Sequence, residues 1–168
     1  MKLMDTSSII LFLEHIPEYE FLITFSETGE IMIITPQVEE EYNIKRNPSL
    51  FNENYNIEKL INEEILIKKD SEINSLFKNR YFFLGKGEKS IMSLALEYEE
   101  QSLDYYCVLD DFKARRVALK LGLNVKGSIG LLLILKERGL LKNSNEIVEK
   151  IRDSQFRISD NILEELNA

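Results

Sequence analysis

Acidic side chains follow the ends of two apolar segments that have the composition of buried strands. Asp5 ends the run 2–4, and Asp110 and Asp111 come directly after the run 105–109 (YYCVL). Because ligands gather outside the carboxyl ends of parallel strands, these side chains are expected at one edge of a sheet. Carboxylates that converge stay ionised together only beside a cation, and Mg²⁺ or Mn²⁺ suits such oxygen ligands. The pattern favours a divalent-metal site.

Two glutamates fall near the same predicted edge. Glu41 lies within about two helical turns of the end of the β-branched run 31–35 (IMIIT), on a helix that Pro36 opens. Glu88 lies in the first turn of a helix that follows a Gly-Lys-Gly break. A glutamate in such a place can be a metal ligand or can orient the water that attacks the substrate.

Each of these acids also has an ordinary structural interpretation. Asp5 and Asp110 could cap helices, and Glu88 could stabilise a helix N-terminus through the helix dipole. The three glutamates at 39–41 are typical of a solvated helix face. The functional interpretation rests on the placement of aspartates at two strand ends, and the structural one stays open beside it.

Basic residues follow the Asp110–Asp111 pair. The tract 112–142 holds eight lysines and arginines and a single acid, Glu137, a net charge of +7 that leaves −15 for the rest of a chain whose net charge is −8. A carboxylate–metal centre beside cations suits phosphodiester hydrolysis, because the metal activates water and the cations hold the phosphate backbone. Cations on the solvent-facing sides of two amphipathic helices are the structural alternative.

The elements that must position these side chains alternate between strands and helices, which implies an α/β fold with a parallel sheet covered on both faces. No linker or internal repeat divides the chain, so one domain is predicted over 1–168, with C-terminal helices (about 144–168) packed on the core. The asparagine-rich stretch 43–62 gives no clear prediction. Strands are predicted at 2–4, 31–35, 65–67, 105–109 and 124–126, and helices at 6–14, from 36 onward, 70–77, 87–99, 112–121, 128–138, 144–153 and 160–166.

Composition excludes several classes of protein. The 168 residues contain no apolar run near the roughly 18 that a membrane span needs, and the first residues lack a signal-peptide cleavage site, so no membrane partner and a cytoplasmic location are expected. The lone Cys107 cannot form an internal disulfide. His15, the only histidine, lies outside the acidic clusters, which argues against a histidine metal site. The aromatic residues at 81–83 and 105–106 are predicted to be mostly core, although an exposed tyrosine could stack on a base.

Five segments together resemble the PIN-domain family. The most specific of them contains DDFKARRVA, an Asp-Asp-x-x-Ala-Arg-x-x-Ala block that is similar to the prokaryotic, VapC-like PIN subgroup. The segments are KLMDTSS (2–8), TPQVEEEY (35–42), GKGEKSIMSLALE (85–97), VLDDFKARRVALKLGLNVKGSIGLLLILKERGLL (108–141) and FRISDNILEELN (156–167).

The resemblance implies a three-layer α/β/α sandwich around a central parallel sheet, with a cluster of acids that binds Mg²⁺ or Mn²⁺. The first acid of the family pattern matches Asp5, and Ser7 matches the supporting hydroxyl that often follows it. The second acid matches Glu41 and the third matches Glu88.

The fourth acid of the pattern matches the Asp110–Asp111 pair. Asp111 is favoured because a Thr-x-Asp arrangement is usual in the family, but Leu109 stands in place of that threonine, so the choice stays open. The implied catalytic residues are Asp5, Glu41, Glu88 and Asp111, and the implied metal ligands are Asp5, Glu88, Asp110 and Asp111.

The function that the resemblance implies is that of a metal-dependent endoribonuclease, with Lys113, Arg115 and Arg116 holding RNA phosphates. Many family members are toxins that a small antitoxin neutralises, and many form homodimers. RNA, an antitoxin and a second copy of the chain are therefore the expected partners. The alternative is a non-catalytic PIN-like module that binds RNA or a protein and keeps its acidic pocket, and a nuclease that acts on DNA is a third reading.

Overall fold

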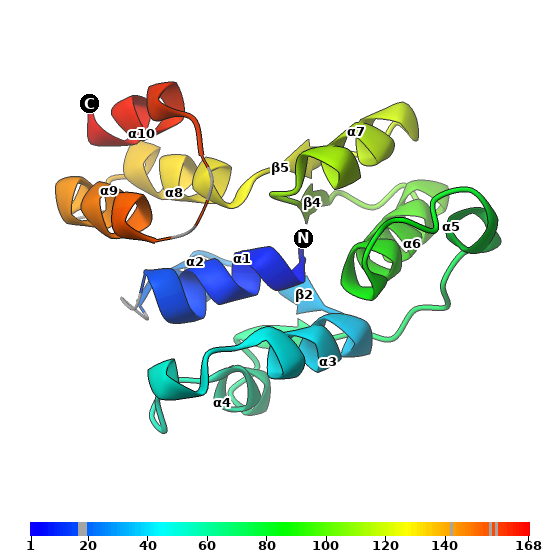
Figure 1. Cartoon of the computed structure of the whole chain (residues 1–168), viewed down its shortest axis with the longest axis horizontal. Helices are drawn as coiled ribbons and strands as arrows, with labels where there is room; N and C mark the ends of the chain where they lie inside the picture. The colour runs from blue at the N-terminus through cyan, green and yellow to red at the C-terminus, as the bar shows by residue number, and fades with distance from the viewer. Residues whose placement is uncertain (17–19, 142, 155, 157) are drawn as a thin grey trace.

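Five parallel strands form a single sheet in the order β3-β2-β1-β4-β5. The structure is a computed structural model that describes residues 1–16, 20–141, 143–154, 156 and 158–168 (Figure 1). Lys142, the last cation of the basic tract, lies outside the described residues. The strands are β1 (Lys2–Met4), β2 (Met32–Ile34), β3 (Leu66–Lys68), β4 (Tyr106–Val108) and β5 (Val125–Lys126).

β1 occupies the centre of this sheet. Leu3 pairs with Ile33 of β2 on one side and with Cys107 of β4 on the other. All three residues of β1 are buried, as expected for a parallel strand that is covered on both faces. Asp5, which follows β1 directly, therefore lies at the middle of the carboxyl edge of the sheet.

Helices flank the sheet and complete a three-layer α/β/α arrangement, so the predicted fold class is confirmed (Figure 1). α3 packs against α1 and α6, and α10 packs against α8 and α9. No helix among the described residues is both long enough and apolar enough to cross a membrane. The helices are α1 (Thr6–Ile10), the π-helical segment η1 (Leu11–His15), α2 (Glu20–Glu27), α3 (Pro36–Lys45), the 3₁₀ turn η2 (Pro48–Leu50), α4 (Ile57–Asn62), α5 (Ser75–Asn79), α6 (Lys86–Glu100), α7 (Phe112–Lys120), α8 (Ser128–Glu137), α9 (Ser144–Asp153) and α10 (Asp160–Asn167).

Two predicted helices differ from those in the structure. The prediction of a helix at 70–77 with an aspartate cap is wrong. Asp70 does not cap a helix, because its carboxylate accepts a hydrogen bond from the neighbouring Ser71 N at 3.0 Å. α5 begins only after Asn74, whose Oδ1 accepts from Leu76 N at 3.0 Å. The helix predicted at 6–14 is α-helical only to Ile10, and continues as the π-helical η1.

Candidate functional site

Asp5 is a buried carboxylate that also caps a helix. Its side chain is 1% exposed, and its Oδ1 accepts a hydrogen bond from Ser8 N at 2.9 Å, at the start of α1. Burial raises the pKa of Asp5 well above its usual value, Asp110 and Glu88 raise it further, and the hydrogen bonds of Ser8 lower it. The cap predicted for Asp5 is therefore present, and the same carboxylate also lies within the electrostatic reach of two other acids.

The two adjacent aspartates after β4 have different environments. Asp110 accepts hydrogen bonds from Ser128 N at 2.7 Å and from Ser128 Oγ, at the start of α8. Burial raises the pKa of Asp110, although Ser128 and the nearby Arg115 lower it. Asp111 is exposed and caps α7, because its Oδ1 accepts from Lys113 N at 2.8 Å and Ala114 N at 2.9 Å. Asp111 therefore provides the helix cap that was predicted for Asp110. Asp110 is the aspartate whose charge raises the pKa of Asp5.

Glu88 and Glu41 approach this edge from α6 and α3. Glu88 Oε2 accepts from Gly85 N at 2.9 Å, as in a capping box. Burial raises the pKa of Glu88, the bond from Gly85 lowers it, and the charges of Asp111 and Glu41 raise it. Glu41 Oε2 accepts from Thr6 Oγ1 at 2.8 Å and lies 3.7 Å from Lys45 Nζ.

Thr6 is a site residue that the sequence analysis missed. Its hydroxyl joins α1 to Glu41 on α3, whereas the family pattern singles out Ser7 as the supporting hydroxyl. The signal was present in the DTSS segment, where three consecutive hydroxyl residues follow Asp5. Only the packing of α1 against α3 decides which of them faces the glutamate.

Gly87 lets α6 approach α1 and α3 closely. A Cβ at this position would lie 2.8 Å from Thr6 Oγ1, 2.9 Å from Glu41 Oε2 and 3.3 Å from Val38 Cγ2. Two of these distances are shorter than real Cβ contacts allow, so a side chain here would displace the Thr6 hydroxyl and the Glu41 carboxylate from their present positions. The helix start that carries Glu88 therefore requires glycine.

We expect Gly87→Ala to lower the free energy of unfolding by about 1–3 kcal/mol, because overpacking displaces buried groups. Gly130→Ala is the matched control, since a Cβ in that helix would lie 3.6 Å from Lys126 Cβ, an ordinary contact. That control should raise stability by about 0.5–1 kcal/mol, as alanine does in place of glycine in a helix. Urea denaturation measures both. Equal effects of the two substitutions would contradict the close approach at Gly87.

A cavity of about 500 Å³ opens beside the two aspartates. His15 lines it together with the aspartates, although no group of three His, Cys, Asp or Glu side chains that could hold a metal forms among the described residues. His15 lies in η1, five residues after Ile10, which also lines the cavity. A π-helical turn aligns residues five apart, a spacing that α-helical periodicity does not predict. Ser7, the predicted supporting residue, also lines this cavity. The full set of lining residues is Ser7, Ile10, His15, Asp110, Asp111, Phe112 and Phe156.

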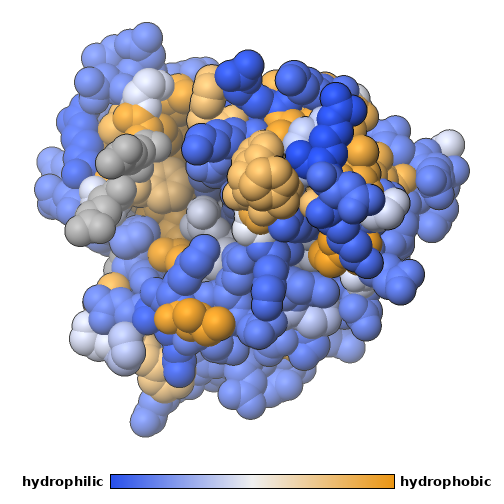
Figure 2. All heavy atoms as spheres, turned by 45° about the vertical axis from the view of Figure 1, so that its right-hand side comes forward, coloured by the Kyte–Doolittle hydropathy of each residue, from blue (hydrophilic) through white to orange (hydrophobic). Residues whose placement is uncertain are grey.

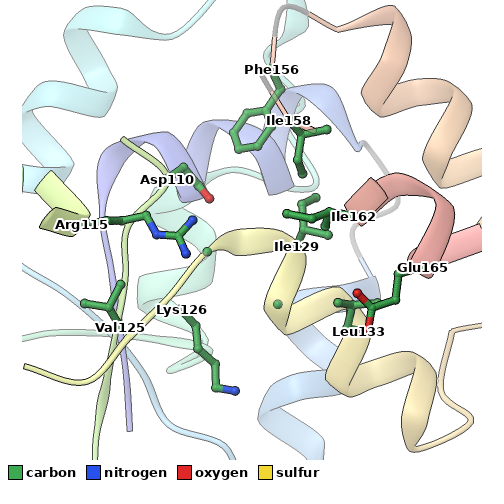
Figure 3. Close-up of a pocket in the computed structure, with 12 residues that line it drawn as sticks. Asp110, Arg115, Val125, Lys126, Ile129, Leu133, Phe156, Ile158, Ile162 and Glu165 are labelled. Atoms are coloured by element: carbon green, nitrogen blue, oxygen red, sulfur yellow. The ribbon is translucent and has the colours of Figure 1, made fainter. Parts of the chain in front are cut away.

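A second cavity, of about 320 Å³, also borders Asp110. Figure 3 shows the carboxyl group of Asp110 and the guanidinium group of Arg115 directed into a space that Ile129 and Ile162 close from the opposite side. The three cations predicted to hold phosphates are therefore divided. Arg115 faces this cavity, whereas Lys113 and Arg116 line a third one with Tyr81 and Phe83.

The side-chain oxygens at this edge of the sheet are of the kind that binds a divalent cation. They belong to carboxylates, the oxygen ligands that Mg²⁺ and Mn²⁺ prefer, and burial and mutual repulsion raise the pKa values of Asp5 and Glu88. A bound cation would relieve that repulsion. Within the part of the chain that the structure describes, no three His, Cys, Asp or Glu side chains lie in one group that could hold a metal ion. Asp5, Glu88, Asp110 and Asp111 are the residues from which such a site would be assembled.

Comparison with known proteins finds a match at the level of the family. A family model described as a PIN domain matches residues 1–168. No curated protein and no solved structure matches the chain.

Proposed function

Because this chain belongs to the PIN-domain family, whose members are generally nucleases, we propose that it is a divalent-metal-dependent endoribonuclease. The observation that carries the proposal is the place of the buried Asp5 directly after the central strand β1, where the half-buried Asp110 and Glu88 are near enough to raise its pKa. Repulsion among acids is tolerated in a folded protein where a cation or a chemical role compensates for it.

The proposed roles follow from the positions of the side chains. Asp5, Glu88 and Asp110, with Asp111 at the rim, would hold Mg²⁺ or Mn²⁺. A bound ion supplies Lewis-acid stabilisation of the charge that develops on the phosphate during hydrolysis. Glu41, which Thr6 holds in place, orients the attacking water.

Cations on α7 and near it bind the RNA backbone in this proposal. Arg115 lies beside Asp110 and lowers its pKa, so it can bring a phosphate to the acids. Lys113 and Arg116 lie on the neighbouring side of α7 and hold the strand next to the site. Binding should weaken as salt rises, because phosphate contacts release counterions.

The resemblance to VapC-like proteins supports a narrower proposal. The chain would be the toxin of a toxin–antitoxin pair that acts in the cytoplasm, with a small antitoxin as its protein partner and a homodimer as its assembled form. The DDFKARRVA block is the sequence feature behind this proposal.

A non-catalytic RNA- or protein-binding module is the second candidate. The observation that favours it is that Asp5, Glu88 and Asp111 each accept a hydrogen bond from a backbone N–H at a helix start, so these acids have a structural role without a metal. Leu109, which stands where the family usually has a threonine, also favours the non-catalytic module.

Incubation of the purified chain with single-stranded RNA tests the proposal. We expect cleavage with Mn²⁺ or Mg²⁺ and none with a chelator, measured by gel electrophoresis of end-labelled RNA. A DNA strand of the same sequence should stay intact. Metal-dependent binding without cleavage would support the non-catalytic module instead, and cleavage of DNA alone would correct the substrate.

A further inference from the structure

The turn 81–84 holds two phenylalanine rings in solvent. Phe82 is 75% exposed and Phe83 is 53% exposed, so the expectation that this aromatic segment is mostly core is wrong for both. Their neighbours anchor the turn, since Leu84 is buried and the Tyr81 ring lies 6.1 Å from the ring of the buried Phe77. The two exposed rings meet nearly edge to face, at 6.3 Å and 78°.

Hydrogen bonds fix the backbone of this turn. Leu84 N donates to Tyr81 O at 3.2 Å, and Lys89 Nζ donates to Phe82 O at 3.2 Å. The rings are therefore presented by an ordered backbone whose two flanking side chains pack inward. An ordered pair of exposed aromatic rings needs an explanation other than burial, because it leaves a large apolar area in water.

Cations lie beside the Phe83 ring. Phe83 lines a cavity of about 420 Å³ together with Lys113, Arg116 and Lys120 of α7. Arg116 Cζ also lies 5.7 Å from the centre of the Phe112 ring, which is 72% exposed. Figure 2, in which this side of the molecule comes forward, shows hydrophobic side chains exposed among hydrophilic ones.

The charge of this surface is strongly positive in an acidic chain. Residues 78–89 contain four cations and one acid, Glu88, and three cations of α7 line the cavity beside Phe83 with no acid among its lining residues. A second copy of the chain would bring the same charges against one another in a two-fold interface. An anionic polymer with flat apolar faces complements both the cations and the rings, and single-stranded nucleic acid has this chemistry.

The surface also adjoins the carboxylates. The turn 81–84 leads directly into Gly85, whose N–H bonds to Glu88, and α7 begins directly after Asp111. We propose that Phe82 and Phe83, with Lys113, Arg116 and Lys120, form a stacking platform that holds unpaired bases of the RNA and so selects single-stranded over double-stranded substrate. The platform rests on the proposed function, because the RNA that it holds is the strand to be cleaved.

A tryptophan at position 83 would report on the platform. The chain contains no tryptophan, so Phe83→Trp places a single indole there. Phe51→Trp is the matched control, because Phe51 is 51% exposed, close to the 53% of Phe83, and has Arg46 5.2 Å from its ring centre, much as Phe83 shares its cavity with Arg116.

Titration at low salt in a chelator, with a 12-nucleotide uridine RNA, should strongly quench the emission of Phe83→Trp and leave that of Phe51→Trp nearly unchanged. Duplex RNA of the same length should quench little, because its bases are already stacked. Equal quenching by duplex, or equal quenching of the control, would overturn the platform. An emission shift that depends on protein concentration without RNA would assign the surface to self-association instead.

Alanine variants measure the contribution of the rings to binding. Phe82→Ala and Phe83→Ala should each weaken binding of the single strand about tenfold and leave duplex binding unchanged, as expected for the loss of one stacked base. Unchanged affinity for the single strand would overturn the platform. Cleavage by the unmodified chain is scored separately, so cleavage without quenching rejects only the platform, and quenching without cleavage rejects only the ribonuclease.

Discussion

Asp5→Asn is expected to lower the rate of RNA cleavage about a hundredfold or more without unfolding the chain. The loss of one charged ligand removes about 3 kcal/mol of transition-state stabilisation, on the scale of metal-assisted catalysis. The fold should survive, because asparagine caps helices as well as aspartate does and its Oδ1 can still accept from Ser8 N.

Asp104→Asn provides the matched control for charge. Asp104 is an exposed acid on the loop before β4, away from the carboxyl edge of the sheet. Its substitution should leave the cleavage rate within about twofold, because removing one exposed charge has a small effect. Initial rates of cleavage, with circular dichroism to verify folding, measure both variants. Equal activity of Asp5→Asn and the unmodified chain would show that the proposed centre is wrong.

Stability without metal should fall as the pH rises from about 4 to neutral. The pKa values of Asp5, Glu88 and Asp110 are all raised in the folded chain, mainly by burial. A raised carboxyl pKa means that the folded state binds the proton more tightly than the unfolded state does. The stability that this gives is complete below the usual carboxyl pKa of about 4, and is lost as the pH rises through the raised values.

A divalent cation should restore that stability at neutral pH. Mn²⁺ at about 100 times its dissociation constant stabilises a folded protein by about 2.7 kcal/mol, which raises Tm by about 5–10 °C in a chain of this length. The gain should be much smaller at pH 4–5, where protonated carboxyls bind metal poorly. Melting curves at both pH values, with Mn²⁺ or with chelator, measure the effect.

The same melting curves separate these acids from the rest of the chain. Asp5→Asn should be more stable than the unmodified chain in chelator at neutral pH, because it lacks a charge that burial disfavours. The pKa of Glu30, by contrast, is lowered: burial raises it, but hydrogen bonds from Lys2 and Arg138 outweigh that effect. The stability that Glu30 contributes is lost only as the pH falls into the acid range. Glu30 therefore does not affect the change in stability expected above pH 5. A Tm that is insensitive to both pH and Mn²⁺ would contradict the metal site.

The framework of the fold was predictable because its signals are local. The β-branched run 31–35 and the run 105–109 each contain a buried parallel strand, and Pro36 starts α3 as expected. The helix predicted at 70–77 failed because an aspartate can bond to the next residue as readily as it caps a helix. Asp70 does so, and the cap passes to Asn74.

For the candidate site, the strand ends where the acids lie were predictable, but the role of each acid was not. Sequence spacing places Asp110 and Asp111 at one edge, but it does not distinguish the roles of two adjacent aspartates. The difference is made by Ser128, 18 residues away, which binds the side chain of Asp110 and leaves Asp111 to cap α7. The exposure of Phe82 and Phe83 was equally hidden, because two phenylalanines between a tyrosine and a leucine have the composition of a core segment.

The central position of β1 has a consequence for how the chain matures. β1 pairs with residues 32–33 on one side and with residues 106–108 on the other, so its second neighbour is made long after the first. On a ribosome, a chain that has emerged only through β3 contains Asp5 but not Asp110 or Arg115. Closing so long a loop is also among the slower events of folding. The acids and the cations of the proposed centre therefore come together late, after the sheet can form around β1.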